Sequence, residues 1–166
     1  MNKCIPTHLV SILTLYTLFI FKIQSRLSSH TRSIKTLTFN KQERLKSRKL
    51  IEQLFSEGQG FSIFPLKVLY AFTQLSTGVP LQATVSVSSR NFKKAVDRNK
   101  IKRQLREVYR LQKADMSQQI AEANKQLALF FIYTGKELPY YNDLFEKMKK
   151  MLSRLRDIAA NNQKVD

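Results

Sequence analysis

A chain of 166 residues with 43% hydrophobic and 25% charged residues has the length and balance of a single globular domain. Its 29 Lys and Arg residues outnumber the 12 Asp and Glu residues, and the formal net charge of +17 indicates a polyanionic partner rather than acidic small-molecule chemistry. The single cysteine, Cys4, excludes an internal disulfide framework and a zinc site made of Cys pairs, so a reducing compartment is expected.

Residues 1–36 form an apolar N-terminal extension whose nature the sequence leaves open. Cys4–Phe21 carries no formal charge and is rich in Leu, Ile and Phe, but its polar residues make it borderline for a membrane span. As a signal peptide it has only Lys3 in its n-region and lacks an Ala-x-Ala-like cleavage site. Three interpretations therefore stand: a membrane helix, a cleaved signal, and a disordered extension or one translated from a start assigned too early.

The first predicted elements after this extension are a helix and two strands. Hydrophobic residues at 50, 51, 54 and 55 have helical spacing and Gly58 follows as a stop signal, which predicts a helix over residues 47–57. Residues 58–74 are rich in aromatic and β-branched side chains and are interrupted by Pro65. We therefore predict two strands joined at a bend.

The remaining predicted elements are a strand, a helix, a second strand and a last helix. Residues 81–88 alternate between apolar and polar side chains, which is typical of a half-buried strand. Asp97 is expected to cap a helix that runs to about Lys113, followed by a short helical or loop stretch. Leu127–Tyr133 is an unbroken apolar run typical of a central strand. Pro139 then opens a final helix with one apolar stripe, formed by Leu144, Met148, Met151, Leu152 and Leu155.

The order α-β-β-β-α-β-α predicts an α+β fold. We expect a two-layer sandwich in which helices pack against a mostly antiparallel sheet. This domain is placed at residues 37–158, between the N-terminal extension and a C-terminal tail at 159–166.

Positive charge is concentrated in residues 90–113, which hold ten basic and two acidic side chains. Wound as a helix, residues 98–111 place six polar side chains within an arc of about 140° and three apolar ones on another side. The rise of about 5.4 Å per turn is comparable to the phosphate spacing of a nucleic-acid backbone, and Arg offers each phosphate a planar fork. We therefore predict a helix that binds a phosphate backbone. The residues of its polar arc are Arg98, Asn99, Lys102, Arg103, Arg106 and Arg110, and those of its apolar side are Ile101, Leu105 and Val108.

The run FKKAVDRNKIKRQLRE at residues 92–107 resembles the signature of the bacterial ribonuclease P protein component, an Arg-Asn-Arg triplet followed by Ile-Lys-Arg and a further Arg. Lys100 stands in the third position of the triplet, which keeps the charge but loses the bidentate geometry of Arg. ERLKSRKLIEQLFSEG at 43–58 is similar to the family's first helix, and ATVSVSSR at 83–90 to its third strand. The resemblance covers about Leu37 to Arg156.

This resemblance implies a ribosomal protein S5 domain 2-like fold with a left-handed βαβ crossover through the basic helix. It implies a cytoplasmic protein that serves as the accessory subunit of an endoribonuclease, whose RNA subunit performs the chemistry with Mg²⁺. The implied partners are that catalytic RNA and precursor tRNA, from which the 5′ leader is removed. No further protein partner and no membrane contact are expected.

The resemblance also implies two binding surfaces on the protein, and neither catalytic nor metal-binding residues. Leader binding would take place in a cleft between the first helix and the sheet, by base stacking on aromatic side chains beside basic ones. Ile51 occupies a position where the family often has an aromatic side chain, so one stacking platform is missing. The implied leader-binding residues are Phe39, Arg44, Phe55, Tyr70 and Arg90. The implied contacts to the RNA subunit are Lys93, Lys94, Arg98, Asn99, Lys100, Lys102, Arg103 and Arg106.

Two rival functions remain at this stage. A structural RNA-binding protein of the ribosomal type would use the same basic helix, and a membrane-tethered basic protein would use the apolar extension as its anchor. A protein nuclease is disfavoured, because Asp97, Asp143 and Glu146 do not form the paired carboxylates that hold two metal ions. Co-purification with one large catalytic RNA, with ribosomal RNA or with a membrane fraction would separate the three functions.

Overall fold

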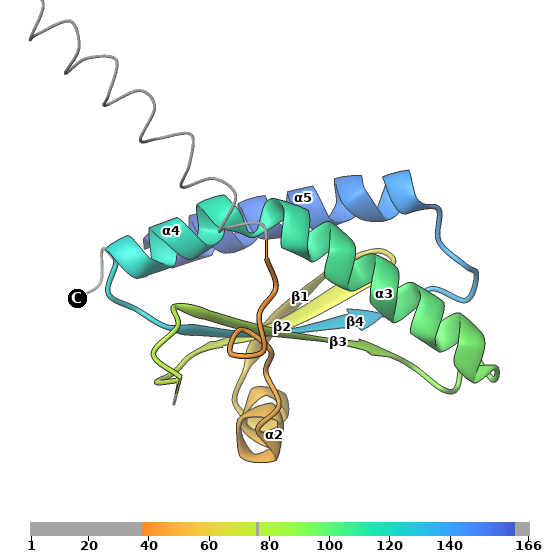
Figure 1. The fold of residues 1–166 in the computed structure, drawn as a ribbon, viewed down its shortest axis with the longest axis horizontal. Helices are drawn as coiled ribbons and strands as arrows, with labels where there is room; N and C mark the ends of the chain where they lie inside the picture. The colour runs from red at the N-terminus through yellow and green to blue at the C-terminus, as the bar shows by residue number, and fades with distance from the viewer. Residues whose placement is uncertain (1–37, 76, 162–166) are drawn as a thin grey trace, which may run out of the picture. The chain divides into compact units, whose positions relative to one another are not determined.

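The computed structural model describes residues 38–75 and 77–161, which form a four-stranded sheet with helices on both of its faces (Figure 1). The strands are β1 (Gln59–Ile63), β2 (Leu66–Phe72), β3 (Leu81–Val87) and β4 (Leu127–Tyr133), in the order β1-β2-β4-β3. β1 with β2 and β2 with β4 are antiparallel, whereas β3 and β4 are parallel. The sheet is thus mostly antiparallel, and its apolar strand β4 is central, as the sequence predicts.

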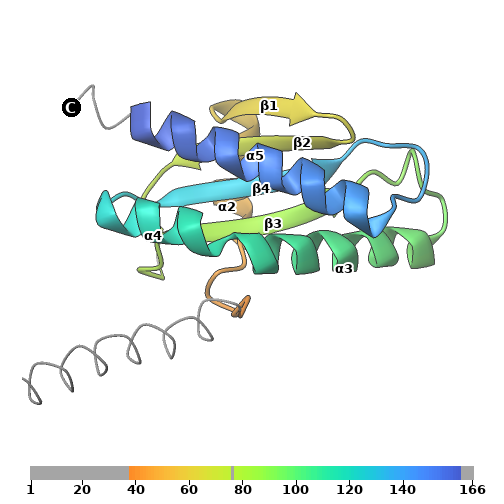
Figure 2. The ribbon, with the colours of Figure 1, turned by 90° about the horizontal axis from the view of Figure 1, so that it is seen from above.

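The described helices are α2 (Arg48–Ser56), α3 (Ala95–Gln112), α4 (Ala114–Glu122) and α5 (Tyr141–Asn161). Figures 1 and 2 show α3, α4 and α5 together on one face of the sheet and α2 on the other. α3 and α4 connect the parallel strands β3 and β4, so the stretch that the sequence left open as helix or loop is a helix. The structure has the two expected layers, and α2 is a single additional helix on the second face of the sheet.

The alternation of side chains along the two middle strands builds both cores. On β2, Leu66, Val68 and Tyr70 face the large core under α3 and α5, while Leu69 and Ala71 face α2. On β4 the odd-numbered residues enter the large core and the even-numbered ones face α2, and all of β4 except Ile132 is buried. β4 therefore lacks a polar face because helices cover both of its sides.

The predicted ends of the helices are confirmed except at three places. Pro139 does not open the last helix, because α5 begins two residues later, at Tyr141. Ser47 caps α2 and its hydroxyl accepts a hydrogen bond from the Leu50 amide. α5 continues to Asn161 with Ala159 buried, so the helix extends three residues into the segment expected to be a tail. α3 begins two residues before Asp97, and Asp97 lies in its first turn rather than at its N-cap. A carboxylate in the first turn still interacts favourably with the helix dipole.

The segment from Phe39 to Leu45, here called the edge segment, lies along the outer edge of β3. The Leu45 amide donates to the Ala83 carbonyl at 3.0 Å, and the Ala83 amide donates to the Glu43 carbonyl at 2.8 Å. The Glu43 carboxylate pairs with the buried ammonium of Lys113 at the end of α3. These contacts join the edge segment to both the sheet and α3.

The interpretations of the N-terminal extension concern residues that lie outside the described part of the chain. They stay predictions. Among residues 38–75 and 77–161, no helix has the length and apolar character needed to cross a membrane.

Candidate nucleic-acid interface

The apolar side of α3 packs into the large core, and this packing determines which of its side chains face outward. Ile101, Leu105, Val108 and Tyr109 are at most 2% exposed and lie in the large core. Burial raises the pKa of Tyr109 far above its ordinary value, with the nearby charge of Glu43 adding to the effect. The inner side of α3 is therefore held firmly, and the predicted separation of apolar and basic sides is confirmed.

The outer side of α3 and the residues just before it form a surface that we call the basic surface. All eight residues expected to contact an RNA subunit lie on it or at its start. Arg98 and Lys102 are half-buried. The exposed members are Lys93, Lys94, Asn99, Lys100, Arg103 and Arg106.

Arg98 differs from the other members because its guanidinium is bonded within the protein. Its Nη1 donates to the carbonyls of Phe92 and Lys93, at 2.8 and 2.7 Å. These bonds hold the chain that enters α3, where the N-cap residue Lys94 makes no capping bond with its own side chain. Arg98 thus orders the first turn of α3 and has fewer donors left for a phosphate.

The acidic side chain of Glu107 does not neutralise the exposed cations of the basic surface. Glu107 pairs with Arg110 at 2.6 Å, and this hydrogen bond lowers the pKa of the Glu107 carboxyl. Among the described residues, no carboxylate forms an ion pair with Lys100, Arg103 or Arg106. A row of cations without counter-charges is suited to bind a polyanion.

Phe55 lies on the opposite face of the sheet, at the exposed side of α2. Its ring is 58% exposed and meets the ring of Phe130 edge-to-face, with the ring centroids 5.1 Å apart. Phe130 belongs to the small core under α2. Phe55 therefore lies exposed on the face of the sheet that carries α2, and its role in leader binding stays a prediction.

Tyr70 does not lie in that cleft, which corrects the expectation that it lines one surface with Phe55. Because side chains alternate along β2, Tyr70 points into the large core, where it is 7% exposed. Its hydroxyl donates to Gln59 Oε1 at 2.7 Å, and its ring lies between those of Phe61 and Phe72. Burial raises the pKa of Tyr70.

The other three residues expected to bind the leader lie elsewhere. Phe39 and Arg44 belong to the edge segment, where the Phe39 ring packs against Tyr109 and lies between the cations of Arg44 and Lys113. Arg90 is exposed in the turn after β3. The five residues are therefore spread over the two faces and one edge of the sheet.

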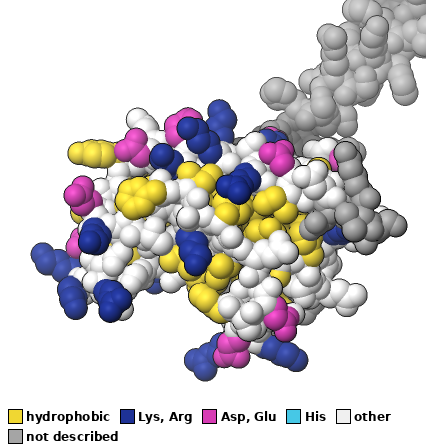
Figure 3. All heavy atoms as spheres, turned by 180° about the vertical axis from the view of Figure 1, so that it is seen from behind, with side chains coloured by type: hydrophobic (Ala, Val, Ile, Leu, Met, Phe, Trp, Pro, Cys, Tyr) yellow, Lys and Arg dark blue, Asp and Glu magenta, His cyan; other side chains and the backbone are white. Residues whose placement is uncertain are grey.

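Sequence reasoning missed a cross-strand row on the α2 face of the sheet. Lys67, Ile132 and Ser86 lie side by side in the register of β2, β4 and β3, next to the row that contains Phe130. Lys67 is exposed, and the other two are partly exposed. The polar position of Lys67 between two buried residues of β2 was a signal for this row. From behind the view of Figure 1, the surface of the molecule shows hydrophobic side chains with Lys and Arg side chains among them (Figure 3).

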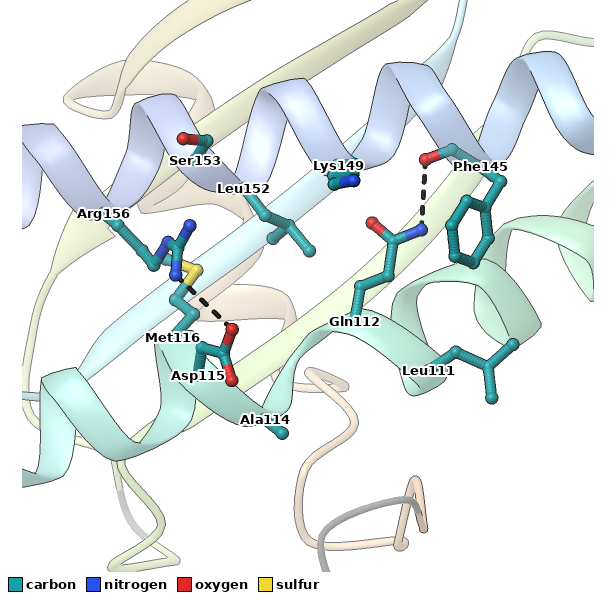
Figure 4. Close-up of a pocket in the computed structure, with 10 residues that line it drawn as sticks. All are labelled: Leu111, Gln112, Ala114, Asp115, Met116, Phe145, Lys149, Leu152, Ser153 and Arg156. Atoms are coloured by element: carbon teal, nitrogen blue, oxygen red, sulfur yellow. Dashed lines mark hydrogen bonds and ion pairs between the residues drawn. The ribbon is translucent and has the colours of Figure 1, made fainter.

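A hollow of about 300 Å³ lies where α3, α4 and α5 meet (Figure 4). Arg156 approaches Asp115 at 3.5 Å across it, and Gln112 Nε2 donates to the Phe145 carbonyl at 3.0 Å. These contacts join the helices on either side of the hollow. Within residues 38–75 and 77–161, no three His, Cys, Asp or Glu side chains gather as metal ligands.

Comparison with known proteins relates this architecture to one family. The family profile for ribonuclease P matches residues 39–156. The ribonuclease P protein component of Porphyromonas gingivalis is 33% identical over 120 residues, which are 72% of this chain and 88% of that protein. The component of Chlorobium phaeobacteroides is 27% identical over 129 residues, with the same two coverages.

Solved structures show the same fold. The RNase P protein of Thermotoga maritima aligns with a TM-score of 0.52 and 25% identity, over 68% of this chain and 96% of that one. The Staphylococcus aureus protein aligns with a TM-score of 0.54 and 18% identity, over 68% and 94%. The profile match includes the edge segment, α2 and all of the basic surface. The chain belongs to the ribonuclease P protein component family.

Proposed function

We propose that this protein is the protein subunit of a ribonuclease P holoenzyme and assists the removal of the 5′ leader from precursor tRNA. The observation that carries the proposal is the basic surface, a row of exposed cations on a helix whose other side is fully buried. Membership in the family supplies the reaction class. The partner that we propose for this surface is the catalytic RNA subunit.

Lys100, Arg103 and Arg106 are spaced three residues apart on the exposed side of α3. Each cation that neutralises a phosphate releases condensed counterions, so the affinity for RNA depends steeply on salt. Arg103 and Arg106 offer planar forks for bidentate phosphate contacts, whereas Lys100 acts as a point charge. We therefore assign the geometrically specific contacts to the two arginines.

We place leader binding on the α2 face, at Phe55 and the adjoining row with Lys67. Aromatic rings beside cations bind single strands with little sequence preference, because every base has a flat face that stacks. Phe55 supplies an exposed ring supported by Phe130, and Lys67 supplies a cation on the same face of the sheet. Tyr70 is left out of this surface because it is buried on the other face.

The role of the protein in this proposal is binding and charge neutralisation rather than bond cleavage. The described residues offer no carboxylate cluster that fits a Mg²⁺ pair, so we derive no step through protein-bound metal. We assign the cleavage chemistry, and the Mg²⁺ that it uses, to the RNA subunit. A protein that neutralises phosphates should lower the Mg²⁺ concentration that the RNA needs.

The test measures binding and cleavage with the full chain, the RNA subunit transcribed in vitro and a precursor tRNA. Arg103→Ala should weaken binding to the RNA subunit and reduce the slope of log affinity against log salt by about one unit. Lys149→Ala removes an equal charge from an exposed site on α5 and should leave that slope unchanged. Cleavage by RNA-free protein, or co-purification with ribosomal RNA alone, would contradict the proposal.

A further inference from the structure

A second hollow, of about 650 Å³, lies beside the start of α3 and has no part in the two surfaces described above. It is formed by the turn between β1 and β2, the end of β4, and the loop that leads into α5. We call it the end pocket. The lining residues used here are Phe64, Lys136, Leu138, Tyr140 and Lys147.

Large apolar side chains are unusually exposed around the end pocket. Tyr140 is 80% exposed, Phe64 is 74% exposed, and Leu138, which also lines the pocket, is 45% exposed. Single exposed apolar side chains are common, but a group of them around one hollow marks a binding site. Two aromatic rings beside one hollow are the arrangement that stacks on a flat ligand.

Hydrogen bonds hold the end pocket next to the basic surface. Asn91 Nδ2 donates to the carbonyls of Thr134 and Gly135, at 3.0 Å each, which joins the residues before α3 to the loop after β4. The amide and hydroxyl of Thr134 donate to the Pro65 carbonyl at 2.8 and 2.9 Å, which joins that loop to the β1–β2 turn. All three segments are thus tied together where the basic surface begins.

The charges around the end pocket suit a nucleic acid that continues from the basic surface. Within the lining, Lys136 and Lys147 balance Glu137 and Asp143. The positive excess comes from Lys93 and Lys94, both exposed on the segment that Asn91 joins to the pocket. A nucleic-acid backbone bound to Lys93 and Lys94 would therefore pass close to the end pocket.

We propose that the end pocket binds an unstacked base of the RNA that lies on the basic surface, with Phe64 and Tyr140 as the stacking rings. Lys93 and Lys94 would contact the phosphates that flank this base. This inference rests on the proposed function and adds to it a third contact, which differs from both the phosphate row on α3 and the leader surface at Phe55.

The experiment compares full-chain variants for binding to the in vitro transcribed RNA subunit over a range of salt concentrations. Phe64→Ala and Tyr140→Ala should each weaken binding by about 5- to 150-fold, the usual effect of losing one stacked base. The slope of log affinity against log salt should not change, because no phosphate contact is lost. Phe64→Tyr and Tyr140→Phe keep the rings and should bind like the unaltered chain.

Three further measurements separate the possible failures. Phe64→Leu keeps an apolar side chain but loses the flat ring, so full binding by this variant would overturn base stacking and indicate an apolar contact such as a protein segment. Unchanged affinity of both alanine variants, with Arg103→Ala weakened as expected, would overturn the end pocket alone. If the unaltered chain fails to bind the RNA subunit, the proposed function and this inference both fall.

Discussion

The two faces of the sheet differ in how completely they are covered. α3, α4 and α5 cover one face and enclose a large core that includes Phe131, Leu129 and Met148, none of which is measurably exposed. The other face carries only α2, a helix of nine residues, and a small core around Leu54 and Phe130. Stability is thus concentrated on the first face, and the second retains uncovered sheet surface, where we propose that the leader binds.

The same contrast separates the two aromatic residues that the sequence assigned to one cleft. Tyr70 is 7% exposed and bonded to Gln59, whereas Phe55 is 58% exposed and touches its support ring only at the edge. The buried ring of Tyr70 therefore contributes to folding, whereas the exposed ring of Phe55 is available for binding. Substitutions at these positions should therefore change different quantities.

The largest expected effect is that of Tyr70→Ala on stability. Truncating a buried aromatic side chain costs about 3 to 5 kcal/mol, so the midpoint of urea denaturation should fall steeply. Tyr70→Phe loses only the hydroxyl bond to Gln59 and should cost about 1 kcal/mol. Discrimination between precursor and mature tRNA by the folded fraction should not change. A stable Tyr70→Ala variant that loses this discrimination would break the comparison.

Next in size is the effect of separating Glu43 from Lys113. Lys113 is 3% exposed, and Glu43→Gln would leave its ammonium buried without a counter-charge, at a cost of about 3 kcal/mol. The double variant Glu43→Gln with Lys113→Met removes both charges and should recover much of that loss. Urea denaturation of the single and double variants measures the difference. Adding Lys113→Met alone completes the cycle, and costs of the two single variants that add up to that of the double variant would show that the pair is not coupled.

Phe55→Ala should give the opposite result to Tyr70→Ala. The loss of one edge-to-face contact should cost about 0.5 to 1.5 kcal/mol of stability. Preference for precursor over mature tRNA should fall by about 1 to 3 kcal/mol if one leader base stacks on this ring. Phe55→Tyr keeps the ring and serves as the matched control. The assay compares dissociation constants of the assembled holoenzyme, and equal losses for both tRNA forms would remove Phe55 from the leader surface.

The smallest expected effect is the dependence of stability on pH through Glu107. The bond to Arg110 lowers the pKa of Glu107 in the folded chain, so the contribution of the pair is present above the ordinary pKa of Glu and is lost as pH falls through the lowered value. Solvent and salt screen this pair, whose side chains are 31% and 46% exposed. Denaturation at neutral and acid pH should show a slightly shallower pH profile for Glu107→Gln, and the difference should vanish at high salt.

Periodicity in the sequence predicted the elements well but not which face each residue occupies. The run at 127–133 gave strand bounds that the structure confirms, and the apolar spacing at 144, 148, 151, 152 and 155 gave the buried side of α5 but not the residues at which that helix begins and ends. In β2, however, Val68, Leu69 and Tyr70 are consecutive hydrophobic residues. Lys67 is the one polar residue that marks a face of β2, and the apolar Leu69 and Ala71 that follow on the same face hide the alternation, so the side on which Tyr70 lies is clear only once the helices are in place.

The basic surface was predictable because the helical spacing of its basic residues already places them on one side of the helix. The bonds of Arg98 to the carbonyls of Phe92 and Lys93 were not, because they depend on how the chain bends before α3. The same holds for the start of α3 ahead of Asp97, since the Arg98 bonds stabilise the residues that precede it. The end pocket could not be predicted from the sequence because its two rings, Phe64 and Tyr140, are 76 positions apart.

The edge segment also governs how copies of this chain behave toward one another. An outer strand with free amide and carbonyl groups is a template on which a strand of another molecule can add, and such additions lead to aggregation. By bonding to Ala83 from both Glu43 and Leu45, the edge segment occupies part of that template on β3, the longer of the two outer strands. The remaining outer strand, β1, has five residues and includes Gly60, which makes it a poor template. The few residues ahead of α2 thus reduce the length of open strand edge on which another copy of the chain could add.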